Sequence, residues 1–417
     1  MNTLFKKGFY LGTRLSQVLG SNLPKNETKK IVFTPVFENE QKLADQVNRI
    51  KWYLPEPANV TIWISLSEKL RNVNLSDLEV PDHQRRPSNI TNRPKIQVCR
   101  PEELDDHIKD ADIFCIWNTE KVSLLKYFLR HPLRMRILDP NFYRYTESHT
   151  SAALLWYDLY SKRQKREAKK QSYLNFKKLV SQYQTSPKAY LFGTGPSIEQ
   201  ATNYNFDDGV RIVCNTVISN EELLEILKPN IITFADCVFH FGVSKYCERF
   251  AEDLKKVVNK YQCHIVTTEV GAALMRAHCP DLRPLIIGVP ATKFSGPQIL
   301  TDKSFKTRSY PYSIVTRFMI PLAAGLSKQI YMIGFDGREP NDKYFWKHND
   351  KAQYSDNMQD VRLAHPAFFN DTDYSVHYQN HCKVLTKMVN NFEQRGVQIK
   401  VLGHSHVPVL KKRLVVM

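Results

Sequence analysis

Short apolar runs alternate with helix-like polar stretches along most of the chain, and this alternation is its strongest constraint on the fold. In the first part of the chain the strand-like runs are 31–37, 60–64, 96–99, 112–117 and 135–138. In the second part they are 189–192, 210–214, 231–234, 264–267, 285–288, 329–333 and 397–402, with helix-like segments at 221–227, 246–261, 316–326 and 383–394. Strands that alternate with helices form parallel sheets covered by helices. The pattern therefore predicts an α/β protein with two Rossmann-like, mostly parallel sheets.

A chain of 417 residues is long enough for two domains with separate cores. We expect an N-terminal α/β domain over 1–145, a connecting segment over 146–185 and a C-terminal α/β domain over 186–417. The connecting segment is predicted as one helix between 145 and 183, with a basic middle in which Glu167 is the single acid. This helix is interpreted either as a solvated connection between the domains or as an inter-domain bridge whose basic face rests on anionic lipid headgroups. Residues 65–95 are interpreted as a loop insertion.

The charge balance predicts an anionic partner, because 59 basic residues stand against 42 acidic ones and give a net charge of +17. A membrane surface, an acidic or phosphorylated substrate and a nucleic acid all fit, but no RNP-like, zinc-knuckle or helix-turn-helix signature favours nucleic acid. The eight cysteines are scattered without a CxxC pair, as is typical of reduced thiols in a cytosolic protein. The N-terminus lacks the apolar core of a signal peptide, and no apolar run is long enough to span a bilayer. We therefore expect a cytoplasmic protein, at most peripheral to the inner membrane.

Residues 193–197, Gly-Thr-Gly-Pro-Ser, follow a predicted strand and are called the glycine loop below. Gly193 and Gly195 permit a tight bend around Thr194 and close approach of a ligand, whereas Pro196 and Ser197 suit the first turn of a helix. Such a loop can direct N–H groups at an anion. It lacks the third glycine and the acid of a dinucleotide fingerprint, and the Gly-Lys-Ser end of a P-loop. A nucleotide site and an ordinary β-to-α turn are equally good interpretations of this loop by itself.

Further motifs follow the later strands, and their order resembles that of the bacterial sialyltransferases of glycosyltransferase family 42 over residues 185–405. That family has Gly-Asn-Gly-Pro-Ser at the position of the glycine loop. A strand that ends in Cys-Asn is matched here by residues 214 and 215, and the resemblance implies that the glycine loop and Asn215 contact the CMP part of a donor. A Ser before a buried helix is matched by Ser313, and a strand that ends in Gly-x-Asp is matched by Gly334 and Asp336.

The last two motifs carry the chemistry that the resemblance implies. Tyr344, eight residues after Asp336, matches the tyrosine that holds the leaving phosphate. Residues 375–381, Ser-Val-His-Tyr-Gln-Asn-His, match a Ser-His-Tyr-x-x-His motif whose last histidine is the catalytic base, here His381, with His377 in reserve. Independently of the family, a tyrosine can donate to a phosphate without a metal, and a histidine of near-neutral pKa suits a general base.

These residues also have ordinary interpretations. Asn215 suits a strand-end turn, Asp336 a helix cap and Tyr344 an aromatic patch, while His381 resembles a surface histidine near a helix start. The shared order of the motifs favours one site. The resemblance therefore implies a glycosyltransferase that uses no metal or other cofactor and moves a sialic acid-like or Kdo sugar from a CMP-activated donor to a glycan or glycolipid.

Two departures from the family leave alternatives open. Thr194 replaces the loop Asn, and Asp236 stands where the family has another Asn; its carboxylate could orient the cytidine ribose or act as a nucleophile and give retention. The family also has no additional N-terminal domain of this size. The presence of such a domain in this chain is typical of the glycosyltransferase B architecture, in which the acceptor binds the N-terminal half. A pterin diphosphokinase-like enzyme with Asp236 and Asp336 on Mg²⁺, and a basic nucleic-acid-binding protein, are the rival hypotheses.

Overall fold

The computed structural model describes residues 3–20, 29–55, 60–85, 94–292, 296–308, 313–339, 348–370 and 373–415. The chain divides into two compact units. Unit 1 comprises Met1–Lys165, Phe241–Glu248 and Asn357–Thr372, and unit 2 comprises Arg166–His240, Arg249–Asp356 and Asp373–Met417. Two segments from the second half of the sequence thus belong to unit 1, which the expected sequential boundaries at 145 and 186 do not anticipate.

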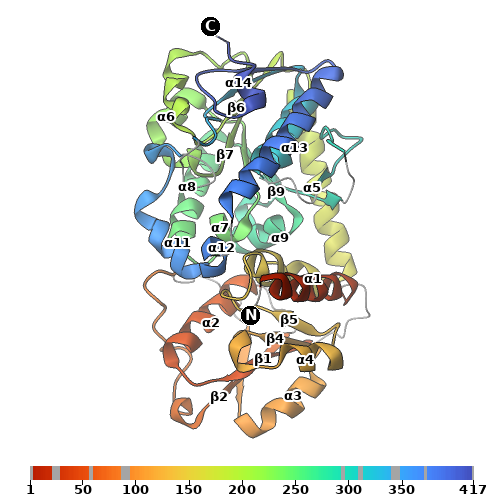
Figure 1. The fold of residues 1–417 in the computed structure, drawn as a ribbon, viewed down its shortest axis with the longest axis vertical. Helices are drawn as coiled ribbons and strands as arrows, with labels where there is room; N and C mark the ends of the chain where they lie inside the picture. The colour runs from red at the N-terminus through yellow and green to blue at the C-terminus, as the bar shows by residue number, and fades with distance from the viewer. Residues whose placement is uncertain are drawn as a thin grey trace. The chain divides into compact units, whose positions relative to one another are not determined.

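Unit 1 contains a five-stranded sheet in the order β3-β2-β1-β4-β5, and every strand pair in it is parallel (Figure 1). The strands are β1 Lys29–Phe37, β2 Val60–Leu66, β3 Lys95–Cys99, β4 Ile113–Ile116 and β5 Met135–Ile137, which confirms the predicted ones. The α-helices of the described chain before residue 160 are α1 Thr3–Gly20, α2 Glu40–Tyr53, α3 Leu104–Asp110 and α4 Leu124–Arg130. Between β2 and residue 85 the described chain contains only the short 3-10 helix η1 Glu68–Leu70, as a loop insertion predicts.

Unit 2 contains a seven-stranded sheet in the order β10-β9-β8-β7-β6-β13-β14, again with every pair parallel. The strands are β6 Lys188–Phe192, β7 Gly209–Cys214, β8 Ile231–Thr233, β9 His264–Thr268, β10 Ile286–Val289, β13 Gln329–Ile333 and β14 Gln398–Val401. A separate pair, β11 Ala291–Thr292 and β12 Thr307–Arg308, was not expected. The mixed α/β class and the two parallel sheets are therefore confirmed.

The helices after residue 160 are α5 Lys162–Tyr183, α6 Glu221–Leu227, α7 Cys237–Phe241, α8 Lys245–Tyr261, α9 Glu269–His278, α10 Ile320–Leu326, α11 Met358–Ala364, α12 Pro366–Asn370, α13 Tyr374–Gln394 and α14 Pro408–Lys411. In unit 2, alternate residues of each strand face opposite sides of the sheet, so helices pack on both faces. Leu191 and Ile212 share a core with Phe176 of α5 and Leu385 of α13, whereas Phe234 meets Phe250 of α8 on the other face. Figure 1 shows α13 running along the first of these faces.

The single helix expected between residues 145 and 183 is interrupted. Two π-helical turns, η4 Glu147–Ser151 and η5 Leu155–Leu159, precede a break at Tyr160, where the backbone becomes extended. The helix α5 then starts from a capping box, in which Ser161 Oγ accepts from Gln164 N at 3.2 Å and Gln164 Oε1 accepts from Ser161 N at 2.8 Å. These reciprocal bonds satisfy two backbone donors, which explains why a new helix begins here.

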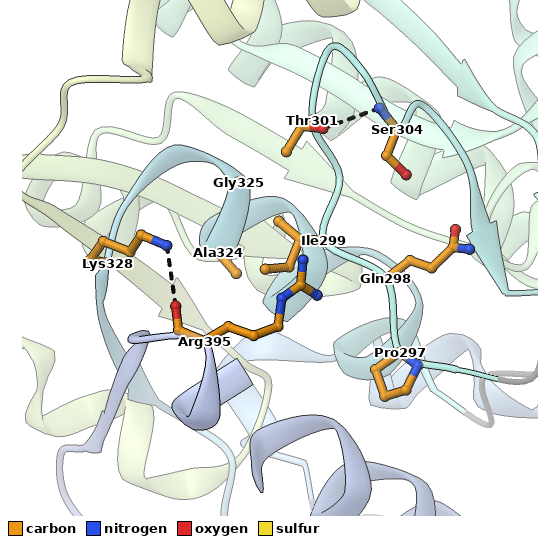
Figure 2. Close-up of a pocket in the computed structure, with 9 residues that line it drawn as sticks. All are labelled: Pro297, Gln298, Ile299, Thr301, Ser304, Ala324, Gly325, Lys328 and Arg395. Carbon is orange, nitrogen blue, oxygen red and sulfur yellow. Dashed lines mark hydrogen bonds between the residues drawn. The ribbon is translucent and has the colours of Figure 1, made fainter. Parts of the chain in front are cut away.

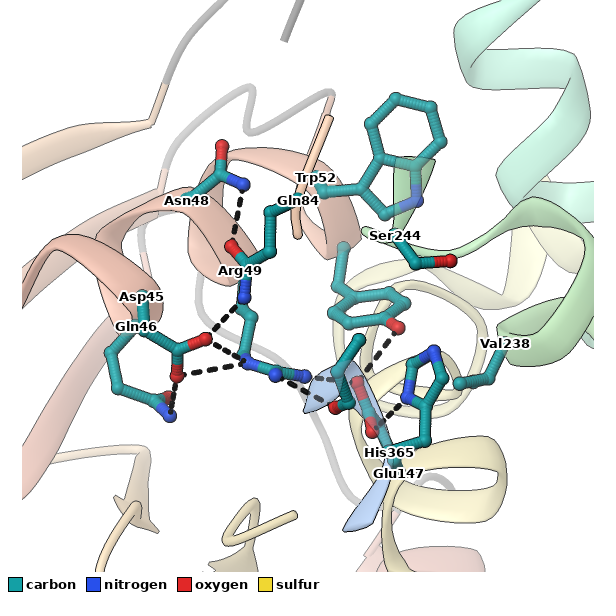
Figure 3. Close-up of polar contacts among 12 residues, drawn as sticks. Asp45, Gln46, Asn48, Arg49, Trp52, Gln84, Glu147, Val238, Ser244 and His365 are labelled. Atoms are coloured by element: carbon teal, nitrogen blue, oxygen red, sulfur yellow. Dashed lines mark hydrogen bonds and ion pairs between the residues drawn. The ribbon is translucent and has the colours of Figure 1, made fainter. Parts of the chain in front are cut away.

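In unit 1, buried polar side chains hold the segments 241–248 and 357–372 to α2 (Figure 3). Arg49 forms an ion pair with Glu147 and donates from Nη2 to the Ala364 carbonyl oxygen at 2.8 Å. Glu147 Oε2 lies 2.5 Å from His365 Nδ1. Trp52 donates from Nε1 to the Phe241 carbonyl oxygen at 2.9 Å. A buried charge without a partner is costly, so this network fixes both segments against α2.

The network shifts the pKa values of its members in opposite directions. Burial acts against the charged forms, but the Glu147 carboxylate raises the pKa of His365 to about 9. The charges of Arg49 and His365 overcome the burial of Glu147 and lower the pKa of that carboxyl group. The folded protein therefore retains a proton on His365 at a pH where the unfolded chain has lost it.

We predict that the unfolding free energy falls as pH rises from about 6.5 to about 9, since a raised histidine pKa stabilises the fold only while the ring is protonated. The expected decrease is ~2 to 3 kcal/mol, and urea denaturation across this range measures it. His365→Gln should abolish most of this slope, whereas the control His107→Gln, at a surface-layer histidine whose pKa is lowered by burial, should keep it. An unchanged slope in His365→Gln would contradict the assignment.

Candidate functional site

The sheet of unit 2 has a topological switch point between β6 and β13, because the strands that follow β6 extend to one side and the last two lie on the other. Ligands of doubly wound α/β proteins bind outside the carboxyl ends of the strands at such a point. Here the glycine loop follows β6, and Gly334 to Asp336 follow β13. The structure thus brings together two motifs that the sequence separates by about 140 residues.

Hydrogen bonds join the two loops directly. Gly193 N donates to the Ile333 carbonyl oxygen at 2.9 Å, and Gly195 N donates to that of Gly334 at 2.8 Å. Asp336 accepts from Ser197 N at 3.0 Å and from Ser197 Oγ at 2.9 Å, while Ser197 Oγ accepts from Gly334 N at 3.0 Å. Ser197 thus joins Asp336 to Gly334 through hydrogen bonds, and this set of contacts is called the Ser197 circuit below.

The Ser197 circuit changes the role expected for the glycine loop. The backbone amides of Gly193, Gly195 and Ser197 donate to oxygens of the protein itself, so they are not free to bind a phosphate in this conformation. A Cβ placed on Gly195 would lie 2.1 Å from Asp336 Oδ2, and one on Gly193 would lie 2.3 Å from the Gly334 carbonyl oxygen. The glycines therefore permit the close approach of two strand ends. Burial raises the pKa of the Asp336 carboxyl group, and its hydrogen bonds from Ser197 oppose that shift.

Asn215 occupies the carboxyl end of β7, next to β6, in a left-handed conformation with φ of 47°. Its Oδ1 atom is buried and has no hydrogen-bond partner among the residues that the structure describes. Buried amide oxygens are normally bonded, so an unpaired one at this strand end is a candidate contact for a ligand. Among the predicted donor-binding residues, Asn215 is therefore the one with a buried acceptor atom that a ligand could satisfy.

Asp236 follows β8, and its Oδ1 atom accepts from Val238 N at 3.0 Å and from Phe239 N at 3.2 Å. The carboxylate thus caps the first turn of α7. Its Oδ2 atom makes no hydrogen bond to the described part of the chain, so one oxygen is available to a ligand.

One histidine that the sequence interpretation missed, His348, lies beside the glycine loop, and His240 is near it. Thr194 Oγ1 is 2.7 Å from Nδ1 of His348, and the Thr194 carbonyl oxygen accepts from Asn349 N at 2.6 Å. Burial lowers the pKa of His348 to about 4, and burial also lowers the pKa of His240 to about 4, so both rings are neutral near pH 7. Their sequence context contains no motif, and only the fold brings them to this edge of the sheet.

The remaining predicted site residues fare differently. Ser313 Oγ accepts from Thr316 N at 3.4 Å, which places this serine at the start of the helical turn η9 Val315–Met319. Tyr344 lies outside the described residues. His377 and His381 lie inside α13 and not ahead of it, because Asp373 caps the helix by accepting from Ser375 N and Val376 N.

The structure corrects the expected environment of His381. Its ring is fully buried, and burial, with a contribution from His377, lowers its pKa to about 3. A histidine in this state is neither near-neutral in pKa nor accessible to an acceptor hydroxyl. His377, one turn earlier, is only partly buried, and the neighbouring Tyr378 accepts from Arg338 N at 3.4 Å, so the start of α13 lies beside the loop that contains Asp336.

A cavity of about 410 Å³ opens at the other edge of the sheet in unit 2 (Figure 2). Lys328 and Arg395, which precede β13 and β14, line it together with Gln298, Thr301 and Ser304. Lys328 Nζ donates to the Arg395 carbonyl oxygen at 3.5 Å. The cavity lies at the amino ends of the strands, so it is separate from the predicted donor site.

In the described ranges, no group of three or more His, Cys, Asp or Glu side chains is arranged to hold a metal ion. None of the described helices combines the length and the hydropathy needed to cross a bilayer. No protein-family model matches the chain, and no curated protein sequence matches it either. The functional argument therefore depends on the geometry of the site.

We predict that Ser197→Ala destabilises unit 2 by ~1 to 3 kcal/mol, because the change leaves Gly334 N and Asp336 Oδ2 buried with a lost partner. Urea denaturation followed by fluorescence measures the difference. Thr202→Ala is the matched control, since this exposed residue of the same 3-10 helix bonds only to the Glu199 carbonyl oxygen and should cost less than ~0.5 kcal/mol. Equal losses in the two variants would show that the Ser197 circuit does not stabilise the site.

Proposed function

We propose that the protein is a glycosyltransferase that moves a sialic acid-like or Kdo sugar from a CMP-activated donor to a cell-surface glycan or glycolipid. The observation that carries this proposal is the unpaired, buried Oδ1 atom of Asn215 beside the switch point of the unit 2 sheet. The amino group of cytosine and the hydroxyl groups of ribose are donors that such an oxygen accepts. The proposal follows the resemblance of the strand-end motifs to those of the sialyltransferases.

The parts of the site receive distinct roles in this proposal. Asn215 and the free oxygen of Asp236 bind the cytidine moiety, while the Ser197 circuit keeps the ends of β6 and β13 in register beside it. Asp336 is thus a positioning residue, because both of its oxygens bond to Ser197. Tyr344 holds the departing phosphate, as the resemblance implies. Asp236 also keeps its alternative role as a nucleophile, which would give retention of configuration.

His377 is the better candidate for the base that deprotonates the acceptor hydroxyl. A base must reach the proton that it removes and must be mostly deprotonated, yet able to hold a proton, near the working pH. The buried ring of His381 meets neither the first nor the last requirement. His377 is partly exposed at the start of α13. In this assignment His381 is a buried packing residue of α13, one turn after the base.

Two parallel-sheet units are consistent with the glycosyltransferase B architecture, in which the acceptor binds the N-terminal half. We therefore place the glycan acceptor on unit 1 and the donor on unit 2. A cytoplasmic location beside the inner membrane would give the enzyme access to lipid-linked glycans.

The pterin diphosphokinase-like alternative requires Asp236 and Asp336 to bind Mg²⁺. Both oxygens of Asp336 accept hydrogen bonds from Ser197, and one oxygen of Asp236 caps α7. A metal on Asp336 would have to compete with the hydrogen bonds from Ser197, whereas Asp236 has one free oxygen, so the occupied carboxylate of Asp336 is what favours the CMP-sugar proposal. The nucleic-acid alternative rests on the net charge of +17 alone.

We predict that CMP binds without added metal and raises the unfolding free energy by ~2.7 kcal/mol at 100 times its Kd. A thermal-shift panel with CMP, CDP, UDP, ATP and GTP, each with EDTA or Mg²⁺, measures this. Asn215→Gly keeps a favourable backbone at φ of 47° and removes the side-chain amide, so CMP affinity should fall ~threefold to tenfold. The matched control is Gln262→Gly, which changes another residue of positive φ, 52°, and should leave CMP affinity unchanged. A shift with ATP and Mg²⁺ alone would establish the kinase alternative.

We predict that His377→Ala lowers turnover ~10²- to 10⁴-fold while CMP affinity stays the same, because the base acts on the acceptor and not on the nucleotide. The control is His381→Leu, which replaces a buried neutral ring by an apolar side chain and should retain most of the turnover per folded molecule. Transfer of sugar from CMP-sialic acid or CMP-Kdo to a lipid-linked glycan gives the rate. If His381→Leu loses turnover and His377→Ala does not, the base is His381 and α13 must rearrange during catalysis.

A further inference from the structure

Unit 1 exposes an unusual amount of apolar surface on α1 and α4. Nine of the fifteen exposed large apolar side chains in the described residues lie on α1, on α4 or just after α4, at Leu133. The outward-facing members used below, called the apolar face, are Phe5, Leu11, Leu15 and Leu19 of α1 and Leu125 and Leu129 of α4. Leu129 is 71% exposed and Leu15 is 56% exposed. Clusters of this kind mark interaction sites, whereas single exposed leucines are normal.

The inward side of α1 combines the aromatic residues Phe9 and Tyr10, which pack on the core, with an unusual number of polar residues for a surface helix. Its buried residues include Thr13, Ser16 and Gln17. Gln17 Nε2 donates to Asp158 Oδ2 at 2.6 Å, and Asp158 in turn forms a buried ion pair with Arg136 at 2.8 Å. These contacts hold the leucines of α1 outward, so their exposure is built into the fold.

The two helices touch each other at Phe128 of α4. The rings of Phe9 on α1 and Phe128 on α4 are 5.3 Å apart between centroids. A Cβ on Gly12 would lie 3.4 Å from the Phe128 ring, so the glycine allows the helices to approach closely. The leucines of α4 therefore extend the apolar stripe of α1.

Basic residues border this surface, and neither helix contains an acid. Lys6 and Lys7 lie on α1, and Lys126 and Arg130 lie on α4. None of the four forms an ion pair with a carboxylate of the described chain. An apolar stripe edged by unpaired cations is complementary to an anionic bilayer, whose headgroups attract the cations while its acyl boundary accepts the leucines.

We infer that the apolar face of α1 and α4 docks unit 1 onto an anionic lipid bilayer, with both helices lying in the interface. The inference names the surface that would bring the enzyme to a lipid-linked acceptor, but it depends only on unit 1 and holds whatever reaction unit 2 performs. It also differs from contact through the basic face of α5. That helix has cations but presents only Tyr173 and Leu174 as exposed large apolar side chains, so it offers little surface to bury.

The test is co-sedimentation of the full chain with vesicles of phosphatidylcholine containing 30 or 0 mol% phosphatidylglycerol, at roughly 0.1 and 0.5 M salt. Binding should require the anionic lipid and weaken at high salt. The double variant Leu125→Ser, Leu129→Ser should lower the partition coefficient at least ~tenfold, because two leucines lose their burial. Lys6→Gln with Lys7→Gln should lower it ~fivefold per lysine.

Matched controls distinguish binding through the apolar face from nonspecific binding through any exposed leucine or any exposed cation. Leu363→Ser changes a leucine of α11 that is 52% exposed, close to the 56% of Leu125, and should leave binding unchanged. Lys177→Gln with Lys178→Gln on α5 removes two exposed cations and should have little effect. Circular dichroism and thermal melting confirm that each variant is folded.

Three outcomes would overturn the inference. Vesicle binding that survives the leucine changes but is lost with the α5 changes would move the contact to α5. Absence of binding to anionic vesicles would remove the bilayer as the occupant. A dimer in light scattering that becomes a monomer on changing Leu125 and Leu129 would make a second copy the occupant. CMP binding should be unaffected in every variant, so failure here is distinguishable from failure of the proposed donor site.

Discussion

The contact between Ser197 and Asp336 joins the ends of two strands that are neighbours in the sheet but distant in the sequence. The edge where β6 and β13 end is the edge where a ligand of this fold class binds, so the position of every proposed donor contact depends on it. The serine hydroxyl donates to one carboxylate oxygen and accepts from the Gly334 amide. Because Gly193 and Gly195 leave no room for a Cβ, the two loops meet at backbone distance. The backbone amide of Ser197, which the sequence suggested as a donor to a phosphate, thus donates to the carboxylate of Asp336 instead.

A second constraint shapes unit 1, whose boundary is not sequential. On α2, Trp52 bonds to the segment 241–248, which follows β8, and Arg49 bonds to the segment 357–372, which precedes α13. The chain returns to unit 2 after each of these segments. Glu147 links Arg49 and His365, so the charges within this buried cluster compensate one another. Each of these excursions is flanked by parts of the unit 2 site, with Asp236 shortly before the first and the start of α13 directly after the second.

The strands could be predicted from the sequence because each is a short apolar run between polar stretches, and all twelve expected runs are strands. The order of strands, and hence the meeting of residues 193–197 with 334–336, required the structure. The break at Tyr160 was missed because the run from 145 to 183 has no proline or glycine, and the Ser161 and Gln164 capping box was its only local signal. His348 was missed because no local pattern marks it, and the burial of His381 was missed because a polar sequence context predicts exposure. Local patterns thus identified elements and several strand-end residues, whereas burial and pairing across the sheet decided their roles.

The most direct test of the account is a crystal structure of the full chain with CMP bound. The account predicts cytidine density at the carboxyl ends of β6 and β7, with a donor group of the nucleotide within hydrogen-bond distance of Asn215 Oδ1 and with the Ser197 circuit intact. Nucleotide density in the cavity beside Lys328 and Arg395, or ATP with Mg²⁺ on Asp236 and Asp336 in place of CMP, would contradict it.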